Sequence, residues 1–217
     1  MINKINIIFY FSSFVLFSFF ISLGFLSYPQ EDALILYRYA NNLAETGAIS
    51  FNLNGSYSEG ATDFLWLLIL SLLSFLGFDP YFSTALISTI CFFIILKIFR
   101  RDVFKSNNIF FYILFVFVLL NMGQVIGSSL YGFSSVIFCT IGLLTYYYAF
   151  KGKLYLWCLF SVIFCLFRPE AFIFFLPTIY VAFKKALRQQ TLKSFLVAFS
   201  ITVLFGIIYI FWRYNYF

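Results

Sequence analysis

Apolar runs approaching 20 residues recur along this chain, and they constrain its fold more than any other feature. Of its 217 residues, 63% are hydrophobic and only 10% are charged, whereas soluble domains carry about 25% charged residues. In lipid every backbone N–H and C=O group must pair within the protein, so runs of this length form helices. A closed β-barrel would instead alternate apolar and polar residues over roughly ten positions, and this chain does not. The sequence therefore predicts an all-α fold, a polytopic transmembrane helical bundle.

Basic residues cluster between the apolar runs, around positions 97–105, 151–153 and 184–193. Cytoplasmic loops of membrane proteins are enriched in Lys and Arg, so we assign these clusters to the cytoplasm. The same rule accounts for the net charge of +6 without a nucleic-acid partner. For the crossings to alternate, the short run 64–78 must lie in or dip into the outer interface. About seven spanning helices are then expected in one domain: 6–26, 81–99, 109–121, 133–150, 154–167, 171–183 and 195–212.

The acidic residues gather on the side opposite the basic clusters. Five of the eight acids fall in the first extracytoplasmic loop: Glu31, Asp32, Glu45, Glu59 and Asp63. In a chain with so little charge, this segment is the first place to look for function.

Residues 31–45 have the pattern of an amphipathic helix lying at the membrane interface. Asp32 falls on the border between the two faces, near Tyr39. Two interpretations remain open. Either Glu31 and Asp32 serve only the dipole of a helix N-terminus, or Asp32 overhangs the membrane surface as a base while Arg38 holds a phosphate. At 100° per residue, the apolar face comprises Ala33, Leu36, Tyr37, Ala40, Leu43 and Ala44, and the polar face Glu31, Arg38, Asn42 and Glu45.

The residue types that are missing narrow the chemistry. The chain has no histidine, so it lacks the commonest general base and metal ligand. Its four cysteines all lie inside apolar runs without a CxxC spacing, which is typical of buried small hydrophobes rather than disulfides or metal ligands. Any catalysis must therefore use carboxylates, Arg, Lys or Tyr.

A second charged feature, Arg168-Pro169-Glu170, interrupts an apolar region of the chain. Ionisable groups at membrane depth are costly and usually line a cavity. The alternative is a simple loop between two short helices, in which Arg168 and Glu170 pair with each other. The alternation of crossings places this break on the same side as Asp32, so we expect Arg168 to open into the same cavity.

These residues resemble the N-terminal signature of bacterial membrane glycosyltransferases of the GT-C type, in particular the subgroup resembling mycobacterial arabinofuranosyltransferases. Members of this family have an acidic pair in the first extracytoplasmic loop and a later Arg-Pro-Glu, and the order and spacing of both motifs are similar here along essentially the whole chain. The segments that carry the resemblance are Glu31-Asp32-Ala33, Tyr37-Arg38-Tyr39-Ala40, Phe51-Asn52, Glu59-Gly60, Leu65-Trp66 and Arg168-Pro169-Glu170.

The resemblance implies transfer of a sugar from a polyprenyl-phosphate donor to a glycan, lipid or protein acceptor at the outer face of the bacterial cytoplasmic (inner) membrane. Asp32 is then the general base or a metal ligand, with Glu31 as its alternate. Arg38 and Arg168 are the candidates for the donor phosphate. Whether a divalent metal ion bridges the acid and the phosphate stays an open question. The further cavity candidates are Glu59, Glu170 and Tyr39.

Two departures from the family keep other functions open. Gly132-Phe133-Ser134 stands where the family usually has a Gly-Leu-Glu-like motif. Family members also run to roughly twice this length, so we expect the domain to be incomplete at its C-terminus. The alternatives are a non-enzymatic lipid-carrier flippase or accessory membrane subunit, and an inactive truncated remnant.

Overall fold

The computed structural model describes Phe11, Val15 and residues 31–53, 55–58, 60, 62–103 and 132–217. All regular structure in these residues is helical, as the sequence predicted. Apart from Phe11 and Val15, the expected helix 6–26 lies outside the described residues, as do the expected helix 109–121 and the candidate Glu59. The helices are α2 (Glu31–Thr46), α3 (Phe64–Phe75), α4 (Pro80–Ile98) with its π-helical continuation η1 (Phe99–Val103), α7 (Ser135–Lys151), α8 (Leu154–Phe167), α9 (Ala171–Arg188) and α10 (Leu192–Tyr216).

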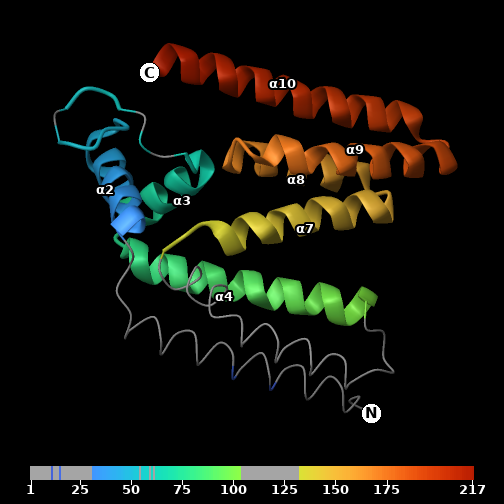
Figure 1. Cartoon of the computed structure of the whole chain (residues 1–217), viewed down its shortest axis with the longest axis horizontal. Helices are drawn as coiled ribbons and strands as arrows, with labels where there is room; N and C mark the ends of the chain where they lie inside the picture. The colour runs from blue at the N-terminus through green and yellow to red at the C-terminus, as the bar shows by residue number, and fades with distance from the viewer. Residues whose placement is uncertain are drawn as a thin grey trace.

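The long helices lie side by side, and the two short N-terminal ones cover one end of them (Figure 1). α7 packs against α4, α8 and α9, and α10 packs against α8 and α9. α2 and α3 pack against each other at the end where α4 and α7 begin and α10 ends. The acid-bearing segments therefore collect at this end, and the turns that carry the basic clusters collect at the other. We call these the acidic end and the basic end.

Local signals in the sequence fix where the helices begin and end. α4 begins at Pro80, whose missing N–H costs nothing in a first turn, and the Asp79 side chain accepts a hydrogen bond from the Phe82 N–H at 2.9 Å. α7 ends at Gly152, which takes the left-handed conformation at φ +69°, as helix C-termini commonly do. The Arg168-Pro169-Glu170 break separates α8 from α9, because a residue before proline avoids the helical region.

Two helices in the described part of the chain are long and apolar enough to cross a membrane. They are Pro80–Asp102, with 23 residues, and Leu192–Tyr216, with 25. The helices α3, α7 and α8 have 12, 17 and 14 residues, and at 1.5 Å per residue even the longest falls short of a bilayer core of about 30 Å. The bundle of seven spanning helices thus stays a prediction, as does the interfacial position of the short run 64–78, most of which forms α3.

The core is built from aromatic side chains that tie α8 to its neighbours. Trp157, which is fully buried, stacks between Phe175 at 5.8 Å and Phe195 at 5.6 Å, and its indole N–H donates to the Thr178 hydroxyl at 3.2 Å. Near the acidic end Phe167, also fully buried, stacks on Trp66 of α3 at 6.3 Å. Such pairs add about 0.5–1.5 kcal/mol each beyond the area they bury. Because Phe167 is fixed in this way, the next residue, Arg168, leaves the helix in a defined direction.

The outer surface of α10 is apolar and uncovered by the described chain. Of the 18 consecutive residues of α10 that are most apolar, only 17% are buried, against 44% for the corresponding stretch of Pro80–Asp102. Contiguous exposed apolar surface of this extent marks contact with lipid or with another protein. Its large exposed side chains include Leu196, Val197, Ile201, Leu204, Phe205, Ile207, Ile208, Ile210 and Phe211.

Candidate functional site

A cavity of about 250 Å³ opens at the acidic end, where α2 begins. We call it the site cavity. Four separate stretches of the chain form it: the first turns of α2, residues 60 and 62–63, residues 132–134 and the break after α8. Both Asp32 and Arg168 line it, as the sequence led us to expect for these two residues. Its walls are Asp32, Ala33, Ile35, Leu36, Gly60, Thr62, Asp63, Gly132, Phe133, Ser134 and Arg168.

Arg168 is held in this cavity by Asp63, not by Glu170. Its Nε donates to Asp63 Oδ1 at 2.6 Å and its Nη2 to Asp63 Oδ2 at 3.2 Å, which is a bidentate pair. Glu170 lies farther away, with 4.0 Å between Arg168 Nη1 and its Oε1, and its side chain is 57% exposed. The sequence had left open that Arg168 pairs only with Glu170 in a simple loop, but Glu170 is a weak second contact of Arg168. Glu170 also does not line the site cavity.

Further contacts fix the Asp63 carboxylate. The Ser134 hydroxyl donates to its Oδ2, and the Thr62 hydroxyl approaches its Oδ1 at 3.4 Å. Burial lowers the pKa of Arg168, but its hydrogen bonds and charge interaction with Asp63 more than offset this, so its pKa is raised above the ordinary value. Arg168 is thus a permanent cation with a fixed orientation. The Ser134 hydroxyl thereby holds the acid that orients Arg168.

Asp63 is the residue that sequence reasoning missed. It was counted among the acids of the first loop but given no role. The available signal was physical: an Arg at membrane depth needs an anionic partner, and Asp63 directly precedes an apolar helix. Nothing in the sequence selects it over the other acids, because the two partners are 105 positions apart.

Asp32 and Glu31 occupy the first turn of α2, and both are exposed. Only Asp32 lines the site cavity. Negative charge is favourable at a helix N-terminus, so both acids suit this position on α2. Within the described part of the chain Asp32 makes no ion pair, which leaves its carboxylate available to accept a proton or a hydrogen bond inside the cavity.

Arg38 lies on another side of α2 and faces a different cavity. It follows Asp32 by six positions, so the two side chains project about 120° apart around the helix. Its Nε donates to the Phe51 carbonyl at 2.8 Å, its Nη2 donates to Asn52 Oδ1 at 3.2 Å, and its guanidinium lies 4.3 Å from the centre of the Phe51 ring. The structure therefore uses Arg38 to hold the following loop and does not bring it to Asp32 and Arg168.

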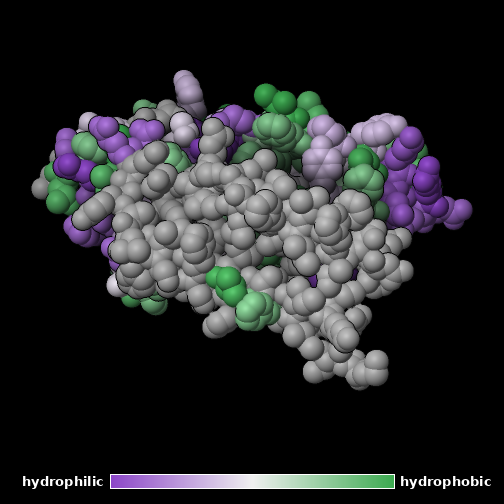
Figure 2. All heavy atoms as spheres, turned by 60° about the horizontal axis from the view of Figure 1, so that its bottom comes forward, coloured by the Kyte–Doolittle hydropathy of each residue, from purple (hydrophilic) through white to green (hydrophobic). Residues whose placement is uncertain are grey.

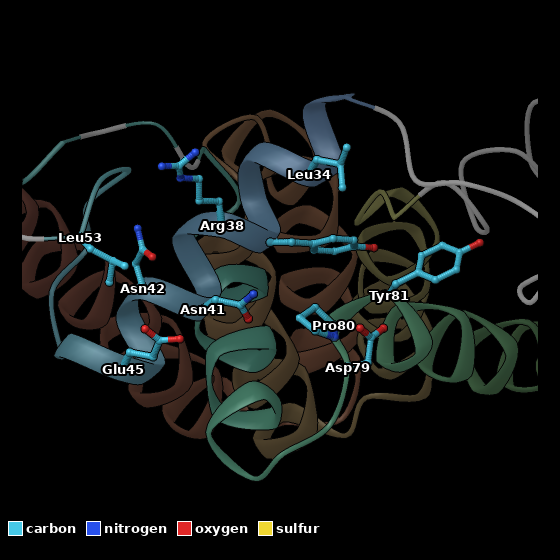
Figure 3. Close-up of a pocket in the computed structure, with 10 residues that line it drawn as sticks. Leu34, Arg38, Asn41, Asn42, Glu45, Leu53, Asp79, Pro80 and Tyr81 are labelled. Carbon is cyan, nitrogen blue, oxygen red and sulfur yellow. The ribbon is translucent and has the colours of Figure 1, made fainter.

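Figure 3 shows this second cavity, of about 550 Å³, with Arg38 above Asn42 and with Glu45 and Asp79 on its lower side. Its polar groups are largely engaged within the protein. Asn42 lines it beside Arg38 and Glu45, as predicted for the polar face of α2. Its side chain is nevertheless buried, and its amide donates to the Ser50 and Phe51 carbonyls at 2.9 Å each.

Tyr39 does not reach the site cavity either. It is buried, and its hydroxyl lies 3.0 Å from Ser58 Oγ. Tyr37 behaves as predicted for the apolar face, since it is buried and donates to the Thr84 hydroxyl of α4 at 3.1 Å. Burial raises the pKa of Tyr37 to about 12, although the bond to Thr84 opposes this rise. Both phenols therefore act as structural ties between α2 and its surroundings.

Gly132 lets the chain pass close to α2 at the cavity wall. Its φ of +95° is in the left-handed region that favours glycine. A Cβ there would also overlap the Tyr37 hydroxyl and the Ala33 side chain. This close approach places Ser134 within reach of Asp63.

Among the described residues, no group of three or more His, Cys, Asp or Glu side chains is placed to hold a metal ion. The site cavity itself contributes two carboxylates, Asp32 and Asp63, and the second is already bound to Arg168.

Comparisons of the chain with protein-family models, with characterised proteins and with solved structures found no match.

Proposed function

We propose that this chain is a membrane-embedded glycosyltransferase that moves a sugar from a polyprenyl-phosphate donor to an acceptor hydroxyl at the outer face of the bacterial cytoplasmic membrane. The observation that carries the proposal is the composition of the site cavity. An exposed carboxylate (Asp32) and an oriented cation (Arg168), which are far apart in the sequence, both line it. The resemblance of the Glu31-Asp32 and Arg168-Pro169-Glu170 segments to GT-C enzymes supplies the reaction type.

The distribution of charge supports a multi-pass membrane location. Figure 2 shows strongly hydrophilic residues gathered at the left and right ends of the visible face. The outer surfaces of α9 and α10 expose large apolar side chains, such as Phe211, Leu204 and Ile173. Two apolar helices have the length of a bilayer. In this arrangement the acidic end faces outward and the basic end faces the cytoplasm.

The chemistry assigns one role to each charged residue of the cavity. The Asp32 carboxylate accepts the proton of the acceptor hydroxyl as its oxygen forms a bond to the anomeric carbon of the donor sugar. The bond between that carbon and the phosphate oxygen breaks, and its electron pair leaves with the polyprenyl phosphate. Arg168 stabilises the negative charge on this leaving group. Asp63 is a positioning residue, because it fixes the Arg168 guanidinium.

A lipid-carrier flippase would place ionisable groups near the middle of several helices. In the described part of this chain, the charged residues of α4, α7, α9 and α10 lie near the helix ends instead, for example Lys97, Lys151, Lys184 and Arg213. This favours an enzyme that works at one surface.

The decisive experiment measures sugar transfer by the full chain in membranes, with a panel of polyprenyl-phosphate sugars as donors. Replacing Asp32 with Asn should lower the rate at least about 100-fold, since a general base contributes roughly 10²–10⁴-fold. Glu45→Gln is the matched control, because Glu45 is an exposed acid of the same helix that lines the other cavity. Near-normal transfer by an Asp32→Asn variant would remove Asp32 from the mechanism.

A further inference from the structure

A third cavity, of about 270 Å³, lies at the basic end, far from the site cavity along the bundle. We call it the basic cavity. It is formed by the last turn of α7 and the C-terminal half of α9, which pack against each other. Its walls are Phe150, Tyr180, Val181, Lys184, Lys185 and Arg188.

The three cations of the basic cavity have no carboxylate partner among the described residues. Asp102 is the acid at this end of the described structure, and it is bound to Lys151, with 2.5 Å between Nζ and Oδ1. Lys184 lies over the Tyr180 ring, 5.1 Å from its centre. Three positive charges therefore line one cavity, and no carboxylate of the described residues balances them.

The cavity walls between these charges are apolar. Phe150 and Tyr180 are 62% and 61% exposed, and both border the cavity. Lys and Arg line such surfaces with their methylene stems while their charged groups reach the rim. The outer surface of α9 continues this apolar surface along the bundle through Leu176 and Ile173, which are also exposed.

We propose that the basic cavity binds the head group of an anionic phospholipid, with an acyl chain lying along the apolar surface of α9. A phosphodiester supplies the missing negative charge, Arg188 is suited to bidentate phosphate binding, and the two lysines act as point charges. A free phosphate ion would match the cations but would gain nothing from Phe150, Tyr180 and Val181. The inference rests on the membrane location in the proposed function, not on the transfer reaction. It explains how the basic end is held at the cytoplasmic leaflet.

Native mass spectrometry of the full chain, released from detergent micelles containing equal amounts of phosphatidylglycerol and phosphatidylcholine, tests this. We expect phosphatidylglycerol to be retained selectively. Lys184→Gln should weaken its retention roughly fivefold, the usual effect of one basic residue near an anionic membrane surface. Lys193→Gln is the matched control, because Lys193 is an exposed lysine at the same end that does not line the cavity.

A second variant tests the cavity without changing its charge. Val181→Trp should fill the cavity and reduce retention of phosphatidylglycerol while all three cations remain. Equal losses for Lys184→Gln and Lys193→Gln, or an unaffected Val181→Trp variant, would overturn the site in favour of general surface attraction. Displacement of the lipid by millimolar inorganic phosphate would identify a free-anion site instead. Asp32→Asn should leave lipid retention unchanged, so failure of the transferase proposal and failure of this one give different results.

Discussion

The two ends of the bundle hold their cations in different ways. At the acidic end Arg168 is met inside the protein by Asp63, a residue 105 positions away, and the pair is completed by the Ser134 hydroxyl. At the basic end Lys184, Lys185 and Arg188 surround a cavity without a carboxylate partner in the described chain. A cation that the fold holds in one orientation, such as Arg168, can orient a reacting group. Cations without a carboxylate partner that lie beside apolar walls are instead suited to bind a negatively charged amphipathic ligand.

The largest expected effect is a difference in sugar-transfer rate between variants of Arg168 and Arg38, the two arginines that the sequence analysis assigned to the donor phosphate. Arg168→Gln should lower sugar transfer by about 10²–10³-fold, the typical cost of removing a preorganised donor to a developing charge. Arg38→Gln should change the rate only a few-fold, because Arg38 holds Phe51 and Asn52 and lines the other cavity. Rates of both variants in membranes, normalised to the amount of inserted protein, check this. Equal losses would mean that the two cavities work as one.

The next effect concerns the pair that fixes Arg168. Asp63→Asn should reduce the free energy of unfolding by about 1–3 kcal/mol, because it leaves a half-buried cation without its counter-charge. The double variant Asp63→Asn/Arg168→Gln should recover part of this loss. Denaturation in mixed micelles measures both. A double variant less stable than Asp63→Asn would show that Arg168 contributes through packing rather than through its charge.

The sequence predicted the elements of this fold better than it predicted the neighbours of their side chains. The expected helix 31–45 is α2, 81–99 is α4, and 195–212 lies within α10, because apolar periodicity and the Asp79-Pro80 and Arg168-Pro169 breaks are local signals. The pairing of Arg168 with Asp63 depends on how α3 and α8 pack, through Trp66 and Phe167, and no local pattern encodes it.

The same limit applies on α2, where periodicity placed Asn42 on the polar face but did not indicate that its side chain is buried. An amide can be buried when it is fully hydrogen-bonded. The partners of Asn42 are carbonyls of the following loop, at Ser50 and Phe51, and the course of that loop is not readable from helical periodicity. Arg38 was assigned to phosphate for a similar reason, since its carbonyl partner at Phe51 belongs to the same loop.

A smaller effect should come from the hydroxyl that joins α2 to α4. Tyr37→Phe removes the bond to Thr84, whose own proton is donated to the Pro80 carbonyl at 2.9 Å, so the cost should be about 0.5–1.5 kcal/mol. The folded pKa of Tyr37 is raised to about 12 from an ordinary value of 10.0. Above pH 10 the unfolded phenol therefore ionises first, and the wild type should lose more stability with rising pH than the Phe variant does. Parallel pH curves would contradict this.

The smallest effect should be at the basic end, in the Lys151–Asp102 pair. Its separation of 2.5 Å is no longer than the 2.6 Å between Arg168 and Asp63, yet the Lys151 side chain is 43% exposed and that of Arg168 only 27%. Exposed ion pairs are screened by salt and contribute little, and this one makes a single contact where Arg168 makes two. Asp102→Asn should therefore leave the unfolding midpoint within experimental error of the wild type at physiological ionic strength, while Asp63→Asn lowers it clearly. Equal shifts for the two variants would show that distance, rather than burial and bidentate geometry, sets the strength of these pairs.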